Sequence, residues 1–181
     1  GELNKNKIIY KSINACISFL PILNGKQLIL IENLVHENKV HMVQEAMVKF
    51  HGSQCGFCTP GFTMSLFSMK KNYKIINNEI IEEALSGNLC RCTGYRPIID
   101  AAKSLNNKKD QDHFKKNQNK TIQLLKKIKE VDIEINYKGR KFFAPKTIPN
   151  LKKILKKYPN AKILSGGTDL SLEVTKFRKD I

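Results

Sequence analysis

Two pairs of cysteines carry the clearest chemistry of this sequence. Cys55 and Cys58 are separated by two residues in "HGSQCGFCTPG", and Cys90 and Cys92 are separated by one residue in "GNLCRCTGYRP". Four thiolates on two such loops can bind a zinc ion or a [2Fe–2S] cluster. Zinc sites usually use two C-x2-C pairs, whereas a C-x-C pair suits a cluster in which each pair holds one iron. The spacing favours the cluster, and a zinc module with four cysteine ligands or unligated buried thiols remain as alternatives.

The residues after each cysteine pair predict the start of a helix. Pro60 follows the first pair and Arg96-Pro97 follows the second, and proline suits the first turn of a helix. Helix N-termini present unpaired N–H groups and partial positive charge, so they should stabilise the reduced state of an anionic cluster and raise its potential. We expect three glycines to let the backbone approach the sulfurs: Gly56, Gly61 and Gly94.

Apolar periodicity predicts that both cysteine loops belong to a compact four-helix bundle over residues 36–105. Its helices are expected to begin near His41 and to cover residues 60–72, residues 78–85 and a segment from about residue 96. Thr59 is expected to cap the second helix.

The flanking regions have different patterns. Residues 1–35 predict short strands in "KIIY", "SINACISFLP" and "KQLILIENL", the end of a β-rich unit. Residues 106–135 predict a basic linker with a polar helix over "TIQLLKKIKE" (121–130). Beyond it, "VDIEINYKGRKFFAP" predicts a hairpin, "IPNLKKILKKYP" an amphipathic helix, and "AKILSGGTDL" a strand ending in a glycine turn. The fold class is therefore α+β.

Charge and composition restrict the setting of the protein. The net charge is +16, and residues 101–160 hold 17 Lys or Arg against 5 Asp or Glu. These are mostly lysines without interleaved aromatics, so a solvated surface is favoured over nucleic acid binding. No apolar run reaches the 18 residues of a membrane span and no secretory signal is recognisable, which predicts a cytoplasmic protein. Five cysteines in that compartment indicate metal or redox chemistry.

Two longer runs, "HGSQCGFCTPGFTMSLF" and "ALSGNLCRCTGYRPIIDAA", closely resemble the molybdenum hydroxylase family. Within it, "INACISFLPILNGKQLILIENL" resembles the small iron–sulfur and FAD subunit of bacterial xanthine dehydrogenases. The runs "FFAPKTIPNLKKIL" and "AKILSGGTDLSLEVTK" are similar to the opening of its FAD domain. The resemblance implies a remnant of a β-grasp ferredoxin domain (1–35), a helical [2Fe–2S] domain (36–105) and the start of an α/β FAD-binding, PCMH-type domain (136–181).

The resemblance also implies roles for individual residues. Cys55, Cys58, Cys90 and Cys92 match the ligands of the cluster next to molybdenum, with Cys92 nearest the pterin. Gln54 matches a glutamine that contacts the molybdopterin of the partner subunit. The residues that match the FAD diphosphate loop are Ile163, Leu164, Ser165, Gly166, Gly167, Thr168, Asp169 and Leu170.

Cys16 has two interpretations. By itself it predicts a small buried hydrophobe in a strand. By resemblance it matches the fourth ligand of the family's other, plant-ferredoxin-type [2Fe–2S] cluster. The three earlier cysteines of that motif would lie upstream of Gly1, so we expect the chain to be a fragment in which Cys16 is an orphan ligand.

The resemblance implies the electron-transfer subunit of an oxidoreductase. In the intact enzyme, electrons pass from xanthine oxidised at molybdopterin in a large subunit, through the clusters, to FAD and NAD. This chain is expected to be inactive without its partner. Three alternatives remain: the small subunit of another molybdenum hydroxylase acting on aldehydes or heterocycles, a non-enzymatic zinc module with four cysteine ligands, and a basic nucleic acid binder.

Overall fold

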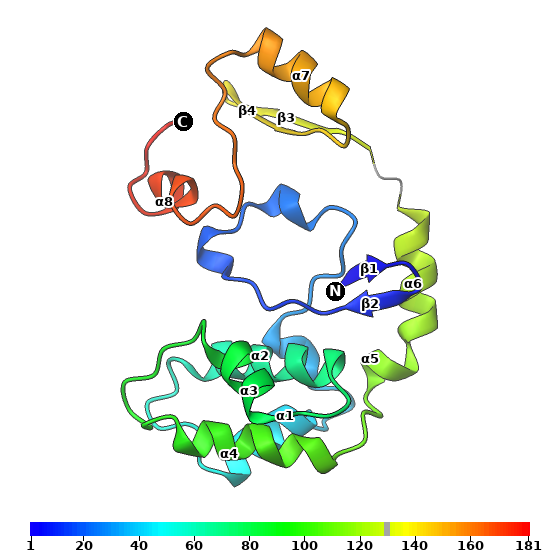
Figure 1. The fold of residues 1–181 in the computed structure, drawn as a ribbon, viewed down its shortest axis with the longest axis vertical. Helices are drawn as coiled ribbons and strands as arrows, with labels where there is room; N and C mark the ends of the chain where they lie inside the picture. Colours follow the sequence, from blue (N-terminus) through cyan, green and yellow to red (C-terminus); the bar gives the residue numbers. More distant parts are fainter. Residues whose placement is uncertain (129–130) are drawn as a thin grey trace. The chain divides into compact units, whose positions relative to one another are not determined.

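The computed structural model describes residues 1–128 and 131–181, and of Asn107 the backbone only. The chain forms two compact units, each described here by itself (Figure 1). The first comprises Gly1–Ser12 and Lys26–Lys126, and the second Ile13–Gly25 and Lys127–Ile181. Among the described residues, every fully buried apolar side chain belongs to the first unit.

Four helices form the body of the first unit, as predicted. They are α1 (Met42–Lys49), α2 (Thr59–Asn72), α3 (Asn78–Leu85) and α4 (Arg96–Ser104), and a short 3₁₀ turn, Leu105–Asn107, continues α4. Helix α1 packs on α2 and α4, and α3 packs on the same two helices (Figure 1). The side chains of Val43, Phe62, Leu66 and Ile98 lie between them with no exposed surface. The bundle therefore has a continuous apolar core to which all four helices contribute or against which they pack.

The starts of the four helices are stabilised in two different ways. His41 caps α1, because its Nδ1 accepts the Val43 N–H at 3.3 Å, and the Asn77 Oδ1 caps α3 by accepting the Ile80 N–H at 2.9 Å. Helices α2 and α4, which follow the cysteine pairs, carry Pro near the first position and no side-chain cap from a described residue. The expectation that Thr59 caps α2 is wrong, because Cys58 occupies that position and the Thr59 hydroxyl donates to Ser53 Oγ at 2.7 Å.

Residues 1–35 contain less strand than predicted. Strands β1 (Glu2–Asn4) and β2 (Lys7–Ile9) form an antiparallel hairpin with Leu3 opposite Ile8. The strands expected in "SINACISFLP" and "KQLILIENL" are not formed, and 3₁₀ helices cover Ala15–Ile17, Leu20–Leu23 and Ile31–Leu34. Among the described residues β1 and β2 pair only with each other, so the 26–34 segment does not extend this sheet. Leu34, 1% exposed, anchors it in the bundle core instead. The β-grasp assignment stays a prediction.

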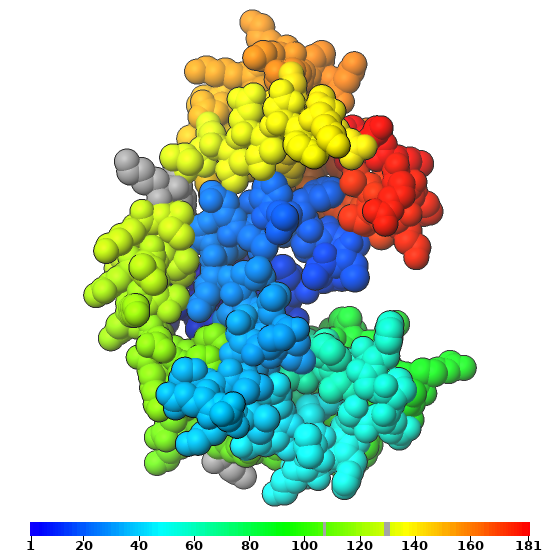
Figure 2. Space-filling view, turned by 180° about the vertical axis from the view of Figure 1, so that it is seen from behind, coloured from blue at the N-terminus to red at the C-terminus, as the bar shows by residue number. Residues whose placement is uncertain are grey.

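Two further helices lie in the region expected to be a basic linker. They are α5 (His113–Lys116) and α6 (Gln118–Lys127), and they bury Phe114 and Leu125 in the core of the first unit. Helix α6 shows its outer face at the surface in Figure 2. The polar helix expected over 121–130 is thus confirmed as far as Lys127, and residues 129 and 130 lie outside the described residues. The domain boundaries themselves remain predictions.

A buried ionic network attaches the start of α5 to the bundle. The Asp112 carboxylate accepts hydrogen bonds from His41 Nε2 at 2.6 Å, from Lys71 Nζ at 2.6 Å and from the Lys115 N–H at 2.8 Å. Lys71 also donates to Asp110 at 2.8 Å. Burial opposes ionisation of Asp112, but the hydrogen bonds from His41 and Lys71 outweigh it and hold the pKa of this carboxyl well below its usual range. The network joins three segments of the first unit.

The second unit contains the predicted hairpin and helix. Strands β3 (Ile133–Tyr137) and β4 (Arg140–Ala144) pair around a turn at Lys138-Gly139, both with positive φ, as a type I′ hairpin requires. Helix α7 (Ile148–Lys157) is capped by the Thr147 hydroxyl. The strand expected in "AKILSGGTDL" is not formed, and a short helix that was not predicted, α8 (Leu170–Thr175), follows the glycine turn. No helix in the described residues is long and apolar enough to cross a membrane.

Candidate metal centre

The first unit brings the four predicted ligand cysteines together. Cys55 and Cys58 lie on the loop before α2, and Cys90 and Cys92 on the loop between α3 and α4. The Sγ atoms of Cys55 and Cys92 are 3.4 Å apart, and the thiols of Cys58 and Cys90 form a second hydrogen-bonded contact. Both contacts join one loop to the other, so the site depends on the docking of the two loops.

Close packing between α2 and the 86–95 loop sets this docking. Asn88 Nδ2 donates to Ser65 Oγ of α2 at 2.8 Å. A Cβ atom on Gly61 would lie 2.7 Å from Asn88 Oδ1, so only glycine permits this approach. Gly61 was expected to let the backbone reach the sulfurs; its close contact in the structure is with Asn88 instead.

Each cysteine loop turns through left-handed backbone. Gly56 has φ +83°, and its carbonyl accepts the Thr59 N–H at 3.2 Å, which closes the turn before α2. Gly94 and Tyr95 follow one another with φ +66° and +68°. Left-handed backbone is unfavourable for a tyrosine by about 1–2 kcal/mol. It is compensated by a hydrogen bond from the Cys90 N–H to the Tyr95 phenol oxygen at 3.0 Å, which folds the loop back over Cys90.

The four sulfurs have unequal surroundings. Hydrogen bonds from the Thr93 hydroxyl (3.2 Å) and the Thr93 N–H (3.4 Å) lower the pKa of Cys90 to about 7. The backbone N–H of Phe57 lowers the pKa of Cys55. Burial raises the pKa of Cys58 to about 11, and the contact with Cys55 raises that of Cys92. The surroundings of the four sulfurs therefore differ in how strongly they stabilise the thiolate form.

The donor chemistry of this site fits a [2Fe–2S] cluster. Such a cluster takes four thiolates, two on each iron. The two loops offer four sulfur donors within one small region, next to the uncapped starts of α2 and α4. Among the residues that the structure describes, no group of three or more His, Cys, Asp or Glu side chains is placed so that it could hold one metal ion.

Several residues beside the cysteines were not singled out from the sequence. Thr93 and Tyr95 contact Cys90 directly, and the signal for them was a threonine and a glycine just after a C-x-C pair, a typical turn composition. Phe57 and Leu89 are 95% and 85% exposed, one on each cysteine loop. Gln54, predicted to contact molybdopterin, is exposed next to Cys55.

The predicted FAD loop forms one turn in the second unit. Gly166 and Gly167 have φ +71° and +86°, and the Gly167 N–H donates to the Ser165 carbonyl at 2.8 Å. Thr168 and Asp169 follow, exposed, immediately before α8. Below the turn, the Ser171 hydroxyl is buried without a hydrogen-bond partner among the described residues. Whether this turn binds FAD stays a prediction.

Cys16 does not lie in a buried strand. Cys16 belongs to the 3₁₀ helix Ala15–Ile17, where it is exposed. Its N–H donates to the Asn14 side chain at 3.0 Å. This turn contacts α8 within the second unit. The interpretation as a small core residue is therefore wrong, and the role as a ligand of another cluster stays a prediction.

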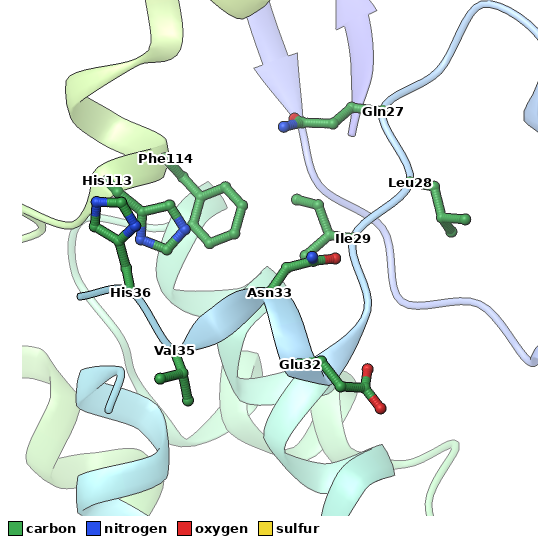
Figure 3. Close-up of a pocket in the computed structure, with 9 residues that line it drawn as sticks. All are labelled: Gln27, Leu28, Ile29, Glu32, Asn33, Val35, His36, His113 and Phe114. Carbon is green, nitrogen blue, oxygen red and sulfur yellow. The ribbon is translucent and has the colours of Figure 1, made fainter. Parts of the chain in front are cut away.

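A separate pocket of about 410 Å³ lies in the first unit (Figure 3). At one end the rings of His36 and His113 stack with centroids 4.5 Å apart. Burial, together with the neighbouring His36 ring, lowers the pKa of His113. None of the predicted site residues lines the pocket, whose walls are Gln27, Leu28, Ile29, Glu32, Asn33, Val35, His36, His113 and Phe114.

Comparison with known proteins identifies the class of this part of the chain. Residues 30–103 match a family model described as a [2Fe-2S] binding domain. All four cysteines of the site lie inside the matched range. This supports an iron–sulfur cluster as the group that the two loops hold.

The relatives are xanthine dehydrogenases and aldehyde oxidases by name. The chain is 49% identical over 102 residues to "Xanthine dehydrogenase" of Blastobotrys adeninivorans, covering 56% of this chain and 7% of that protein. It is 32% identical over 217 residues to "Xanthine dehydrogenase" of Dictyostelium discoideum (95% and 16%). It is 44% identical over 99 residues to "Aldehyde oxidase 1" of Oryctolagus cuniculus (54% and 7%).

A solved structure, quinoline 2-oxidoreductase from Pseudomonas putida 86, is 39% identical with a TM-score of 0.38 and covers 41% of this chain and 46% of that chain. The chain thus spans 7% to 16% of the curated relatives named above. The resemblance to the oxidoreductases of this group is confirmed for the iron–sulfur region, and the bacterial small-subunit assignment stays a prediction.

Proposed function

We propose that this chain is the electron-transfer part of a xanthine dehydrogenase-type molybdenum hydroxylase. Cys55, Cys58, Cys90 and Cys92 hold one [2Fe–2S] cluster, a group that accepts and releases one electron at a time. Electrons enter from a molybdopterin centre on a partner large subunit and leave toward FAD and NAD. The chain itself turns over no substrate, and its residues hold the relay in place.

One observation carries the proposal: thiols from two loops, 37 positions apart in sequence for Cys55 and Cys92, meet at 3.4 Å. The match of residues 30–103 to a [2Fe-2S] binding domain supports the same identity of the bound group. The N–H groups at the starts of α2 and α4 lie on the same loops and stabilise negative charge on the sulfurs.

The partner side of the proposal concerns Gln54 and Cys92. Gln54 hydrogen-bonds the molybdopterin, and Cys92 is the ligand through which the electron enters. Both residues are exposed, which supports this assignment because a partner's cofactor can then approach the cluster closely. The partner is a molybdopterin-binding large subunit.

The flavin side of the proposal concerns the turn from Ser165 to Asp169. Exposed backbone of this turn binds the FAD diphosphate, and the left-handed Gly166 at the surface, followed by the exposed Thr168 and Asp169, supports this assignment. The similarity to the Dictyostelium xanthine dehydrogenase, which extends over 95% of this chain, supports a flavin role for this region. Cys16 is a ligand of a second cluster whose other ligands are not in this sequence.

The test is metal analysis of the full chain after anaerobic reconstitution with iron and sulfide. We expect about two irons and two sulfides per chain and a rhombic EPR signal in the reduced state. The matched pair of variants is Cys92→Ser and Cys16→Ser. The first should lose the signal and the second should keep it, because only Cys92 lies in the four-thiol site.

A colourless protein with one zinc and no sulfide, even when iron and sulfide are in excess, would overturn the relay proposal in favour of the zinc module. Loss of half the iron in Cys16→Ser would contradict the assignment of a single complete cluster. Both outcomes are read from metal content and spectra, without an enzymatic assay.

A second candidate is the same relay in a molybdenum hydroxylase that acts on aldehydes. The 44% identity to aldehyde oxidase 1 over the iron–sulfur region favours it. Co-purification of the chain with its large subunit, followed by assay with xanthine and with an aromatic aldehyde, separates the two. Turnover of xanthine with NAD as acceptor supports the first candidate, and turnover of the aldehyde alone supports the second.

A further inference from the structure

We propose that Thr93 is a positioning residue that raises the reduction potential of the cluster by donating hydrogen bonds to the sulfur of Cys90. The inference rests on the proposed [2Fe–2S] site and adds to it a residue that determines how readily the site accepts an electron. It starts from the contacts that the 90–96 loop makes with its own cysteine.

Thr93 offers Cys90 two donors. Its hydroxyl oxygen lies 3.2 Å from Cys90 Sγ, and its backbone N–H donates to the same sulfur at 3.4 Å. Sulfur acceptors form longer hydrogen bonds than oxygen, so both distances are those of real contacts. A metal-bound thiolate carries no proton, and the hydroxyl must therefore be the donor in this pair.

Tyr95 fixes the direction of that donation. The Tyr95 N–H donates to Thr93 Oγ1 at 3.2 Å, which occupies the acceptor side of the hydroxyl and leaves its proton directed at the sulfur. The Tyr95 phenol oxygen accepts the Cys90 N–H at 3.0 Å, so both ends of the turn are held by one residue. The hydroxyl is thus oriented before the cluster binds.

The core of the bundle holds Tyr95 in turn. Its ring meets the ring of Phe62 edge to face with centroids 6.3 Å apart, and Phe62 has no exposed surface. Tyr95 keeps a left-handed backbone, φ +68°, an unfavourable conformation that persists only where surrounding contacts determine it. Packing in the core is in this way transmitted to the position of one hydroxyl.

The donors are distributed unevenly over the four sulfurs. Cys55 receives the backbone N–H of Phe57, which no side-chain substitution removes. Cys90 is the ligand for which the described residues provide a side-chain hydroxyl. Hydrogen bonds to cluster sulfurs stabilise the more negative, reduced form and raise its potential. A single substitution at Thr93 can therefore change the potential without removing a ligand.

The experiment is an EPR-monitored redox titration of the reconstituted full chain and three variants. Thr93→Val keeps the shape and removes the hydroxyl, and the equilibrium constant for one-electron reduction should fall about tenfold, a shift of about 59 mV to more negative potential. Thr93→Ser keeps the hydroxyl and should restore most of the wild-type value. Iron content should stay at the wild-type level in both.

Thr59→Val is the matched control. Thr59 follows Cys58 on the other cysteine loop, but its hydroxyl donates to Ser53 Oγ at 2.7 Å and not to a sulfur. We expect its potential to equal that of the wild type. If Thr93→Val does not hold iron, Thr93→Ala and Thr93→Ser are titrated as the pair that differs in the hydroxyl.

An unchanged potential in Thr93→Val, or an equal shift in Thr93→Ser, overturns the inference while the cluster itself remains established by its signal. Failure of the wild-type chain to bind iron and sulfide is a different result, since it removes the proposed function as well. The two failures are therefore distinguished by the first spectrum.

Discussion

We expect the first unit to lose much of its stability when the Asp112 carboxylate is replaced by an amide in Asp112→Asn. The Asp112 side chain is 8% exposed, and those of its partners Lys71 and His41 are 4% and 3% exposed. Asp112→Asn keeps the shape but removes the charge and replaces one acceptor oxygen by a donor. The Lys71 ammonium is then left buried with Asp110 alone, or the His41 Nε2–H is left facing a second donor.

Breaking a buried ion pair by removing one partner costs about 3–5 kcal/mol. Because asparagine keeps one oxygen, we expect a loss near the lower limit, about 3 kcal/mol of the free energy of unfolding. The assay is urea unfolding followed by far-UV circular dichroism, since most helices belong to the first unit. With a urea dependence of about 1.5 kcal/mol per molar, the midpoint should fall by about 2 M.

Asp100→Asn is the matched control. Asp100 pairs with Arg96 at 3.3 Å on the surface of α4, with side chains 36% and 80% exposed, and its loss should cost at most about 0.5 kcal/mol. Equal effects of the two substitutions would refute the argument that burial makes the Asp112 network important.

The pH dependence gives a second check. The pKa of Asp112 is lower in the folded than in the unfolded state. Its ionised carboxylate therefore contributes fully to the free energy of unfolding above the unfolded pKa of about 3.9, and this contribution is lost as the pH falls from there toward the folded pKa. The difference in stability between wild type and Asp112→Asn should therefore narrow below about pH 4. A difference that stays constant down to pH 2 would contradict the assignment.

Two further predictions concern the second unit. Gly167→Ala should disrupt the glycine turn, because φ is +86° and the new Cβ would lie 2.7 Å from Ser171 Oγ. Amide hydrogen exchange should then increase over residues 164–172. The control is Gly139→Ala, which should disturb only the β3–β4 turn because nothing lies within 4 Å of its Cβ. Unchanged exchange would mean that the turn tolerates a side chain. The pKa of Tyr158 is lowered by a hydrogen bond from Lys141 Nζ at 3.1 Å, so Lys141→Met should raise the ionisation midpoint measured by ultraviolet absorbance at 295 nm, and a midpoint that does not move would exclude the contact.

The helices of the bundle could be predicted from sequence because their signals are local. The bounds of α3, Asn78–Leu85, agree with the prediction, and an Asn before it and Gly87 after it mark both ends. The strands expected in residues 26–34 and 161–164 could not be judged in this way. Alternating apolar residues show that a segment can be a strand, but the sheet edge it needs is supplied by distant residues. Helix α8, at six residues, is too short to produce a period.

The site was predictable in its ligands and not in their contacts. Spacing identifies Cys55, Cys58, Cys90 and Cys92 as one donor set, but it does not reveal that the contacts run between the loops. The roles of Thr93 and Tyr95 depend on left-handed backbone at both Gly94 and Tyr95. The sequence suggests this conformation for the glycine but not for the tyrosine. The Asp112 network was not predicted, because no local pattern shows that the Lys71 side chain is buried against carboxylates 39 and 41 positions away.

The contact between Cys55 and Cys92 also determines which part of the chain a bound group would enclose. Any group bound covalently by both loops ties residue 55 to residue 92 and encloses α2 and α3 in a ring of the chain. A cross-link that closes a loop of this size restricts the unfolded chain and, by the same estimate as for a disulfide, stabilises the folded state by about 4 kcal/mol. Loading of the site therefore adds stability to a bundle that is already folded, so the apoprotein should be the form that cellular proteases remove more readily.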